Sequence, residues 1–232
     1  MPILLARFSK SNAAAHLTDR AVHDAFVTAF AAAGVTLRMT EGRKPKPRVT
    51  ALAPLAAGVT SECELLQASI EDALDVATVA GAVNAHLPDG LRIEALWTLT
   101  PAQTPPGPQQ FAMAEYAISV PASVDEAALR DRVNAFLAAE QVPIPRRPAP
   151  DAPVVDAHAI VQALRVEERA GRTAILARLP VGGADSLHPR QLAAALGFTD
   201  TEAVRIHRTA FVSETPTEFR PFPLKRRVPD GR

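Results

Sequence analysis

Apolar residues recur along this chain with the spacings typical of amphipathic helices and short strands. After Thr18, one stripe has helical spacing; it comprises Val22, Ala25, Phe26, Ala29, Phe30 and Ala33. This pattern predicts a helix that begins at Thr18 and ends at Gly34, because glycine is favoured just beyond a helix C-terminus. Residues 3–8, before the helix, form an apolar run that predicts a first strand.

The remaining elements are expected from the same periodicities. In the first half we expect a helix at 76–87 and strands at 35–39, 49–55, 63–70 and 91–99. In the second half, helices are predicted at 124–139 and from Pro189 to Gly197, together with extended runs at 111–120, 142–144, 164–168, 173–179 and 203–212.

Both halves therefore follow the order strand, helix, strands, helix, strand. This order predicts an α+β protein made of two tandem ferredoxin-like βαββαβ units, each an antiparallel sheet with its helices on one face. We expect the first unit at 1–99 and the second at 111–214. Between them, 100–110 is a Pro-rich linker, and 215–232 is a basic, Pro-rich tail.

The segment 42–48 carries four cations within seven residues, Arg43, Lys44, Lys46 and Arg48. Its two prolines remove backbone donors and favour extended conformations, so the segment cannot be helical. We expect a stiff arm that binds an anion or RNA, with an affinity that falls with salt at a logarithmic slope near −4 if about four to five cations meet phosphates. The alternative, a solvated loop that protects a strand edge, stays open.

A second polar group lies on the last predicted strand. Alternation places Arg205 and His207 on one face of the sheet and Ile206 and Arg208 on the other. Arg205, His207 and Arg208 are therefore candidate contacts for a phosphate, a carboxylate or a partner protein. The alternative is an exposed polar face over a buried Ile206. Because stacked aromatic residues are scarce here, neither sequence-specific RNA readout nor DNA specificity is expected.

Composition restricts the other function classes. The chain has 25 basic and 25 acidic residues, so affinity for nucleic acid must come from local patches. The single cysteine, Cys63, excludes an internal disulfide and a cysteine-ligated cluster, and its apolar strand predicts a buried, inert thiol. The neighbouring Glu62 and Glu64 are expected to face solvent.

Two further features affect the expected site and location. His16, Asp19 and His23 have spacings that suit a metal, but a helix that begins at Thr18 leaves His16 outside it, so no metal site is predicted. The start of the chain lacks the basic region of a signal peptide, and no apolar run approaches the ~18 residues of a membrane span. We therefore expect a cytoplasmic protein without a membrane partner.

Several strings resemble those of a bacterial family of radical SAM-linked proteins of unknown function, of which this chain looks like a divergent stand-alone member. The chain reads GRKPKPRV at 42–49 and GVTSECE at 58–64. Family members typically read Gly-Phe-Asn-Pro-His-Pro-Arg and Gly-Val-x-Ser-Glu-x-Glu at these places. RFSK at 7–10 and RIHRT at 205–209 are also similar, so the resemblance covers roughly residues 5–212.

The resemblance implies an accessory role beside a radical SAM protein in RNA or ribosome-related maturation. Because this chain has no Cys-x3-Cys-x2-Cys string, the iron–sulfur cluster and S-adenosylmethionine are expected only on the partner, and no cofactor is expected here. At the basic segment, Arg43, Lys44 and Lys46 replace the Phe, Asn and His of the family. Fixed cations at these positions favour electrostatic contact over proton transfer.

Two function hypotheses follow. The first is a non-catalytic accessory module that binds a radical SAM protein, RNA or both through 42–48 and 205–208. The second is an RNA-processing or RNA-modifying enzyme that uses His16 or His207, by analogy with the CRISPR repeat-processing endoribonucleases that share tandem ferredoxin-like units.

Overall fold

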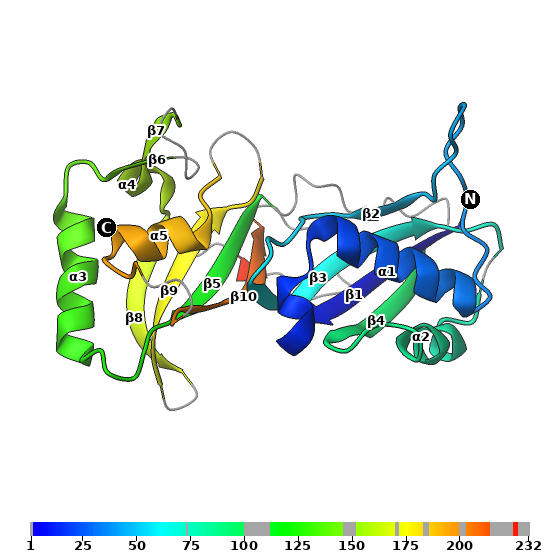
Figure 1. Ribbon diagram of the computed structural model, residues 1–232, viewed down its shortest axis with the longest axis horizontal. Coiled ribbons are helices and arrows are strands. Elements are labelled where there is room, and N and C mark those ends of the chain that lie inside the picture. The colour runs from blue at the N-terminus through cyan, green and yellow to red at the C-terminus, as the bar shows by residue number, and fades with distance from the viewer. Residues whose placement is uncertain are drawn as a thin grey trace. The chain divides into compact units, whose positions relative to one another are not determined.

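The fold was analysed in a computed structural model that describes residues 2–72, 74–99, 112–145, 152–169, 172–182, 186–199, 203–213 and 225–226. The chain divides into two compact units, the first containing β1 to β4 and the second containing β5 to β10 (Figure 1). The predicted linker 100–110 lies outside the described residues. So does the predicted tail 215–232, except for a two-residue strand, β11 (Lys225–Arg226).

The first unit is an antiparallel sheet in the order β4-β1-β3-β2, with helices α1 and α2 on one face (Figure 1). Its elements are β1 (Ile3–Lys10), the 3₁₀ helix η1 (Asn12–His16), α1 (Asp19–Ala32), β2 (Val49–Ala51), β3 (Val59–Ser69), α2 (Val76–Asn84) and β4 (Leu91–Leu99). This strand order is that of a βαββαβ ferredoxin-like unit, as predicted.

The second unit repeats the arrangement, with the strand order β10-β5-β9-β8 and antiparallel pairing. Its elements are β5 (Met113–Ser119), α3 (Glu126–Ala138), β6 (Pro143–Pro145), β7 (Val154–Asp156), α4 (Ala157–Ile160), β8 (Ala163–Arg169), β9 (Arg172–Pro180), α5 (Pro189–Ala195) and β10 (Arg205–Ser213). The small pair β6-β7 and the short α4 are inserted between α3 and β8. The α+β fold class is therefore confirmed.

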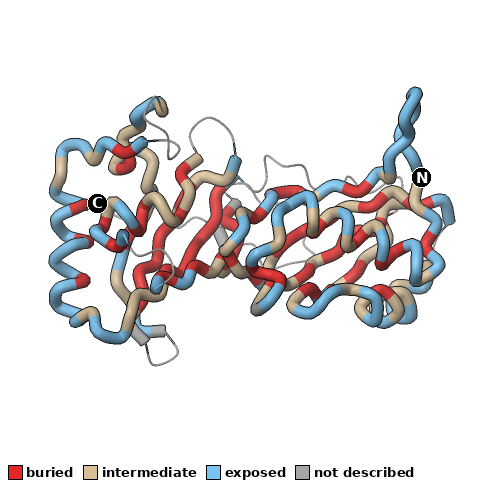
Figure 2. Tube along the Cα trace, in the orientation of Figure 1, coloured by how far each residue is buried: buried red, intermediate tan, exposed pale blue. Residues whose placement is uncertain are grey.

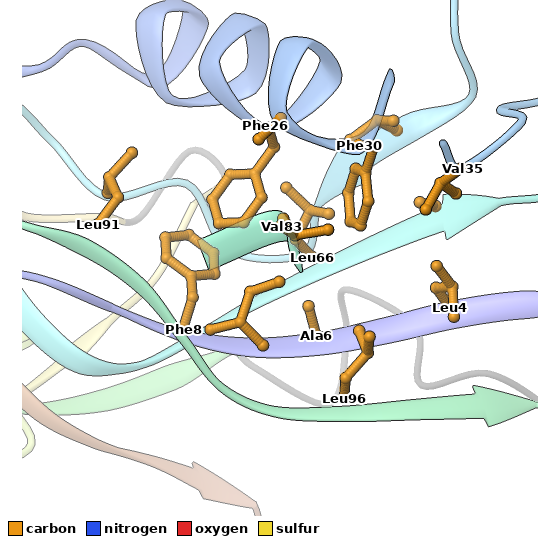
Figure 3. Close-up of a cluster of buried hydrophobic side chains, with 14 of the residues drawn as sticks. Leu4, Ala6, Phe8, Phe26, Phe30, Val35, Leu66, Val83, Leu91 and Leu96 are labelled. Carbon is orange, nitrogen blue, oxygen red and sulfur yellow. The ribbon is translucent and has the colours of Figure 1, made fainter. Parts of the chain in front are cut away.

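Helix α1 covers the core of the first unit. Thr18 caps it by accepting a hydrogen bond from the Ala21 N–H at 3.2 Å, and Gly34 follows its end with a φ of 77°. Phe26 is fully buried, and its ring meets that of Phe8 edge-on with 4.8 Å between centroids (Figure 3). The apolar stripe predicted for this helix thus packs onto β1 and β3.

Several predicted element boundaries were wrong. Residues 35–39 make no strand and contribute only the isolated bridges of Leu37 with Ile70 and of Met39 with Pro47. The strand predicted at 49–55 ends at Ala51, ahead of Pro54, and pairs only with β3 in the described part of the chain. Residues 154–160, for which no element was predicted, form β7 and α4.

The prediction that Glu64 faces solvent was also wrong. Pairing along β1 and β3 shifts between Phe8, opposite Glu64, and Lys10, opposite Ser61. The extra residue in β3 reverses the alternation, so Glu62 is exposed whereas Glu64 is only 3% exposed. Cys63 is half-buried rather than buried, with its Sγ 3.4 Å from the Ser61 Oγ.

Candidate anion-binding site

Residues 38–48, here called the basic hairpin, connect α1 to β2 and turn back on themselves. The Thr40 N–H donates to the Lys46 carbonyl at 2.7 Å, and the Lys46 N–H donates to the Thr40 Oγ1 at 3.0 Å. Gly42 at the tip has a φ of 119°, a conformation that favours glycine. The predicted extended arm is therefore one side of a hairpin, which projects from the sheet in Figure 1.

The base of the basic hairpin is tied to the end of β3. The Arg48 N–H donates to the Arg38 carbonyl at 2.7 Å, the Ser69 N–H donates to the Arg48 carbonyl at 2.9 Å, and the Arg38 N–H donates to the Ser69 carbonyl at 2.9 Å. The Ser69–Arg48 bond continues the pairing of β2 with β3, and the other two tie Arg38, on the opposite side of the hairpin, to Arg48 and to Ser69. The cations near the base are consequently held on a rigid sheet, because their backbone cannot move independently of β3.

All four predicted cations of the hairpin are exposed, and residues 41–46 are exposed throughout (Figure 2). None of the four forms an ion pair with a carboxylate of the described residues. Lys46, Arg48 and Thr50 stand at every second position, but the Val49 N–H donates to the Pro47 carbonyl at 3.0 Å, a tight turn at Arg48 that interrupts the extended run. The hairpin thus presents uncompensated positive charge on an ordered backbone.

A pocket of about 420 Å³ lies at the base of the basic hairpin, along the β2 edge of the first unit. It is lined by residues from the hairpin, α1, β2 and β3, namely His23, Thr40, Lys46, Pro47, Arg48, Val49, Thr50, Gln67 and Ser69. These residues include two with fixed cationic side chains, one histidine, three with hydroxyls and one with an amide. No carboxylate is among these lining residues, which makes the pocket suitable for an anion.

The sheet explains how the polar lining is assembled. Val49 packs in the core beneath α1 and pairs with Ala68, so Thr50 and Gln67, which pair next to them, lie on the sheet face opposite the helices. Ser69 continues this face by the same alternation, and its N–H donates to the Arg48 carbonyl. His23 lines the pocket from α1, on the helix-covered face, and its Nδ1–H donates a 3.0 Å hydrogen bond to the Asp24 Oδ1.

The three contacts predicted on the last strand, β10, differ in their exposure to solvent. On β10, Arg205 is exposed and His207 half-buried, whereas Arg208 is only 2% exposed. The Arg208 guanidinium binds the Tyr116 hydroxyl through Nε at 3.1 Å and Nη2 at 3.0 Å, and it also lies 5.0 Å from the Phe211 ring centroid. Arg208 is therefore an interior residue of the second unit, and a direct surface contact by it was a wrong prediction.

The histidines proposed for an enzyme do not line this pocket. His16 is exposed at the end of η1, outside α1, as the predicted helix start requires. His207 belongs to the second unit. In the part of the chain that the structure describes, no three His, Cys, Asp or Glu side chains are grouped as metal ligands would be, and no helix is long and apolar enough to cross a membrane.

Sequence reasoning missed most of the uncharged lining, including Thr40, Thr50, Gln67 and Ser69. The alternation of Lys46, Arg48 and Thr50 was a usable signal, because these residues directly precede or enter a predicted strand. Gln67 and Ser69 could not be found this way, since the sequence of either strand alone does not determine the register in which β2 pairs with β3.

Three solved structures show distant likenesses to this chain. A Cbf5-Nop10-Gar1 complex matches at 15% identity and a TM-score of 0.42, covering 90% of this chain and 48% of that one. This chain thus spans about half the length of that relative. A protein of unknown function from Galdieria sulphuraria matches at 15% identity and a TM-score of 0.23, covering 89% of this chain and 96% of that one. The first two RRM domains of yeast poly(U)-binding protein Pub1 match at 8% identity and a TM-score of 0.22, covering 90% of this chain and 98% of that one.

Comparison of sequences is more informative. No curated protein matches the chain. A family model described as "Uncharacterized protein conserved in bacteria (DUF2344)" matches residues 4–189, which include the basic hairpin and the whole pocket. Because the match covers most of the chain, the protein belongs to this bacterial family, DUF2344.

Proposed function

We propose that this protein is a non-catalytic accessory module that binds RNA through its basic hairpin and acts beside a radical SAM protein. One observation carries the proposal: four exposed cations without ion-pair partners among the described residues stand on a hairpin whose base is hydrogen-bonded to β3. Such a group suits the phosphate backbone, which dominates the affinity of nucleic-acid binding.

Local charge has to supply this affinity, because the chain as a whole carries no net charge. The hairpin concentrates its cations where Glu41 is the single acidic residue of the segment 38–48. Arg205, exposed on β10, and the half-buried His207 are a second proposed contact in the other unit. Arg208 is left out of the proposed surface because it is buried.

The radical SAM partner is proposed on the sequence resemblance at 42–49 and 58–64. It agrees with the chemistry of this chain, because one cysteine cannot hold an iron–sulfur cluster and the partner would have to supply it. The enzyme alternative gains no support from the pocket, which neither His16 nor His207 lines.

The test compares two fourfold variants that change the net charge equally. The hairpin variant carries Arg43→Gln, Lys44→Gln, Lys46→Gln and Arg48→Gln. The control variant carries the same change at four other exposed arginines, Arg20, Arg92, Arg130 and Arg165. Binding of labelled single-stranded RNA should weaken at least about tenfold in the hairpin variant and change little in the control. Equal losses in both variants would overturn the hairpin as the binding surface.

The partner is tested separately by affinity purification of the tagged chain from its bacterial host. We expect RNA, an iron–sulfur protein with the radical SAM cysteine string, or both to be recovered with the wild-type chain and reduced with the hairpin variant. Recovery of neither would contradict the accessory role.

A further inference from the structure

We propose that the pocket at the base of the basic hairpin binds a phosphomonoester, the terminal phosphate of an RNA or of a small phosphorylated molecule. This proposal deepens the proposed function and rests on it where the ligand is an RNA end. It adds a defined site to a surface that would otherwise bind any phosphate along the backbone.

The charge of the lining matches a dianion. Lys46 and Arg48 both line the pocket, and each carries a fixed positive charge. The carboxylate next to the pocket is that of Asp24, which is 60% exposed and hydrogen-bonded to His23. Glu41, also in the hairpin, is not among the lining residues. Two cations without a lining carboxylate favour a terminal phosphate over an internal phosphodiester, which has one charge and two non-bridging oxygens.

Neutral donors stand beside the cations. Thr50 and Ser69 also line the pocket, and within the described residues no group hydrogen-bonds their hydroxyls. Thr40 accepts from the Lys46 N–H, so its own hydroxyl hydrogen is available to a ligand. The third terminal oxygen of a monoester can thus be bound by hydroxyl donors while Lys46 and Arg48 bind the other two.

The donors are already positioned before a ligand arrives. The Thr40–Lys46 and Arg48–Ser69 hydrogen bonds fix the backbone on both sides of the pocket. Binding therefore loses less conformational entropy than it would on a free loop.

The volume shows that the phosphate would not fill the site alone. About 420 Å³ is within the range of small-molecule pockets, roughly 300–1,000 Å³. The apolar atoms of Pro47 and Val49 and the imidazole of His23 complete the lining and provide contacts for the group that carries the phosphate. A nucleoside or sugar attached to the phosphate fits this mixture of surfaces.

The test uses one labelled RNA in two forms, with a 5′-phosphate and with a 5′-hydroxyl. The pocket variant is Lys46→Gln with Thr50→Val, and the matched control is Arg43→Gln with Lys44→Gln, at the hairpin tip outside the lining. The wild-type chain should prefer the 5′-phosphate at least about tenfold. The pocket variant should lose this preference, whereas the tip variant should weaken binding of both RNAs and keep the ratio. Thermal melting by circular dichroism checks that both variants are folded.

Calorimetric titration with a nucleoside 5′-monophosphate and with inorganic phosphate distinguishes the two sources of the phosphate. If the wild-type chain binds RNA without preferring the 5′-phosphate, and neither small phosphate binds, the pocket proposal is overturned while the proposed function stands. If the monophosphate binds in a pocket-dependent way and RNA does not bind, the phosphate site stands for a small molecule and the proposed function fails.

Discussion

The salt dependence of RNA binding gives a count of the cations that contact phosphate. For a single strand, each neutralised phosphate contributes about −0.7 to the slope of log affinity against log salt. The four exposed cations of the basic hairpin therefore predict a slope of about −2.8 for single-stranded RNA, or about −3.6 if a duplex contributes −0.9 per contact. Between 50 and 200 mM salt, the single-strand value corresponds to a loss of about 50-fold in affinity.

Replacing the hairpin cations one after another shows which residues contact phosphate. Each Gln substitution in the hairpin should reduce the steepness by about 0.7, so the tip pair Arg43→Gln with Lys44→Gln should give about −1.4. Replacement of all four should leave a slope near zero unless the second unit also contributes. Arg205→Gln measures that contribution, because Arg205 is exposed on β10.

Fluorescence anisotropy titrations at four salt concentrations would measure these slopes. A wild-type slope near zero, or one unaltered after all four hairpin cations are replaced, would refute the reasoning. Arg20→Gln is a suitable single-site control, because Arg20 is an exposed cation on α1 outside the hairpin.

Three predictions concern stability and are measured by urea denaturation. Phe26→Ala should lower the free energy of unfolding by about 3–5 kcal/mol, because the ring is fully buried against Phe8. Arg132→Ala should lower it by about 1 kcal/mol and Arg132→Lys by less, since the guanidinium lies 4.8 Å from the Phe198 ring centroid. His188 is the N-cap of α5, and its burial, followed by the charge of Arg190, lowers its pKa. The neutral imidazole therefore stabilises the folded state fully above the ordinary histidine pKa of 6.5, and this stabilisation declines as the pH falls toward the lowered pKa. His188→Asn should keep the cap and remove that pH dependence.

The parts of the fold that were predictable depend on local signals. The apolar stripe of α1, with Thr18 before it and Gly34 after it, specifies a helix through neighbouring residues alone. The strand predicted at 91–99 was confirmed as β4. With two helices placed between strands in each half, few sheet orders remain, and the ferredoxin-like order was among them.

The errors arose where pairing between distant residues decides the structure. The apolar run 35–39 forms no strand because only isolated bridges reach Leu37 and Met39. Glu64 is buried because of an irregularity in the pairing of β1 with β3, and that irregularity has no signature in β3 itself. Arg208 was assigned to the surface for its charge, but Tyr116, on the neighbouring strand, supplies the hydroxyl that allows its burial.

The same distinction applies to the site: the cations and a stiff arm were predicted from the sequence, but the hydrogen bonds that order the arm as a hairpin were not. Fixing a residue costs about 1–2 kcal/mol of backbone entropy, so ordering a free seven-residue arm would cost about 7–14 kcal/mol. That cost is comparable to the binding free energy of a complex with a micromolar Kd, roughly 8 kcal/mol. A disordered run of the same composition would therefore bind poorly. Because the hydrogen bonds of Arg48 with Arg38 and Ser69 form during folding, much of this cost does not fall on binding. It follows that Lys46 and Arg48, at the ordered base, should contribute more affinity per charge than the two cations at the exposed tip.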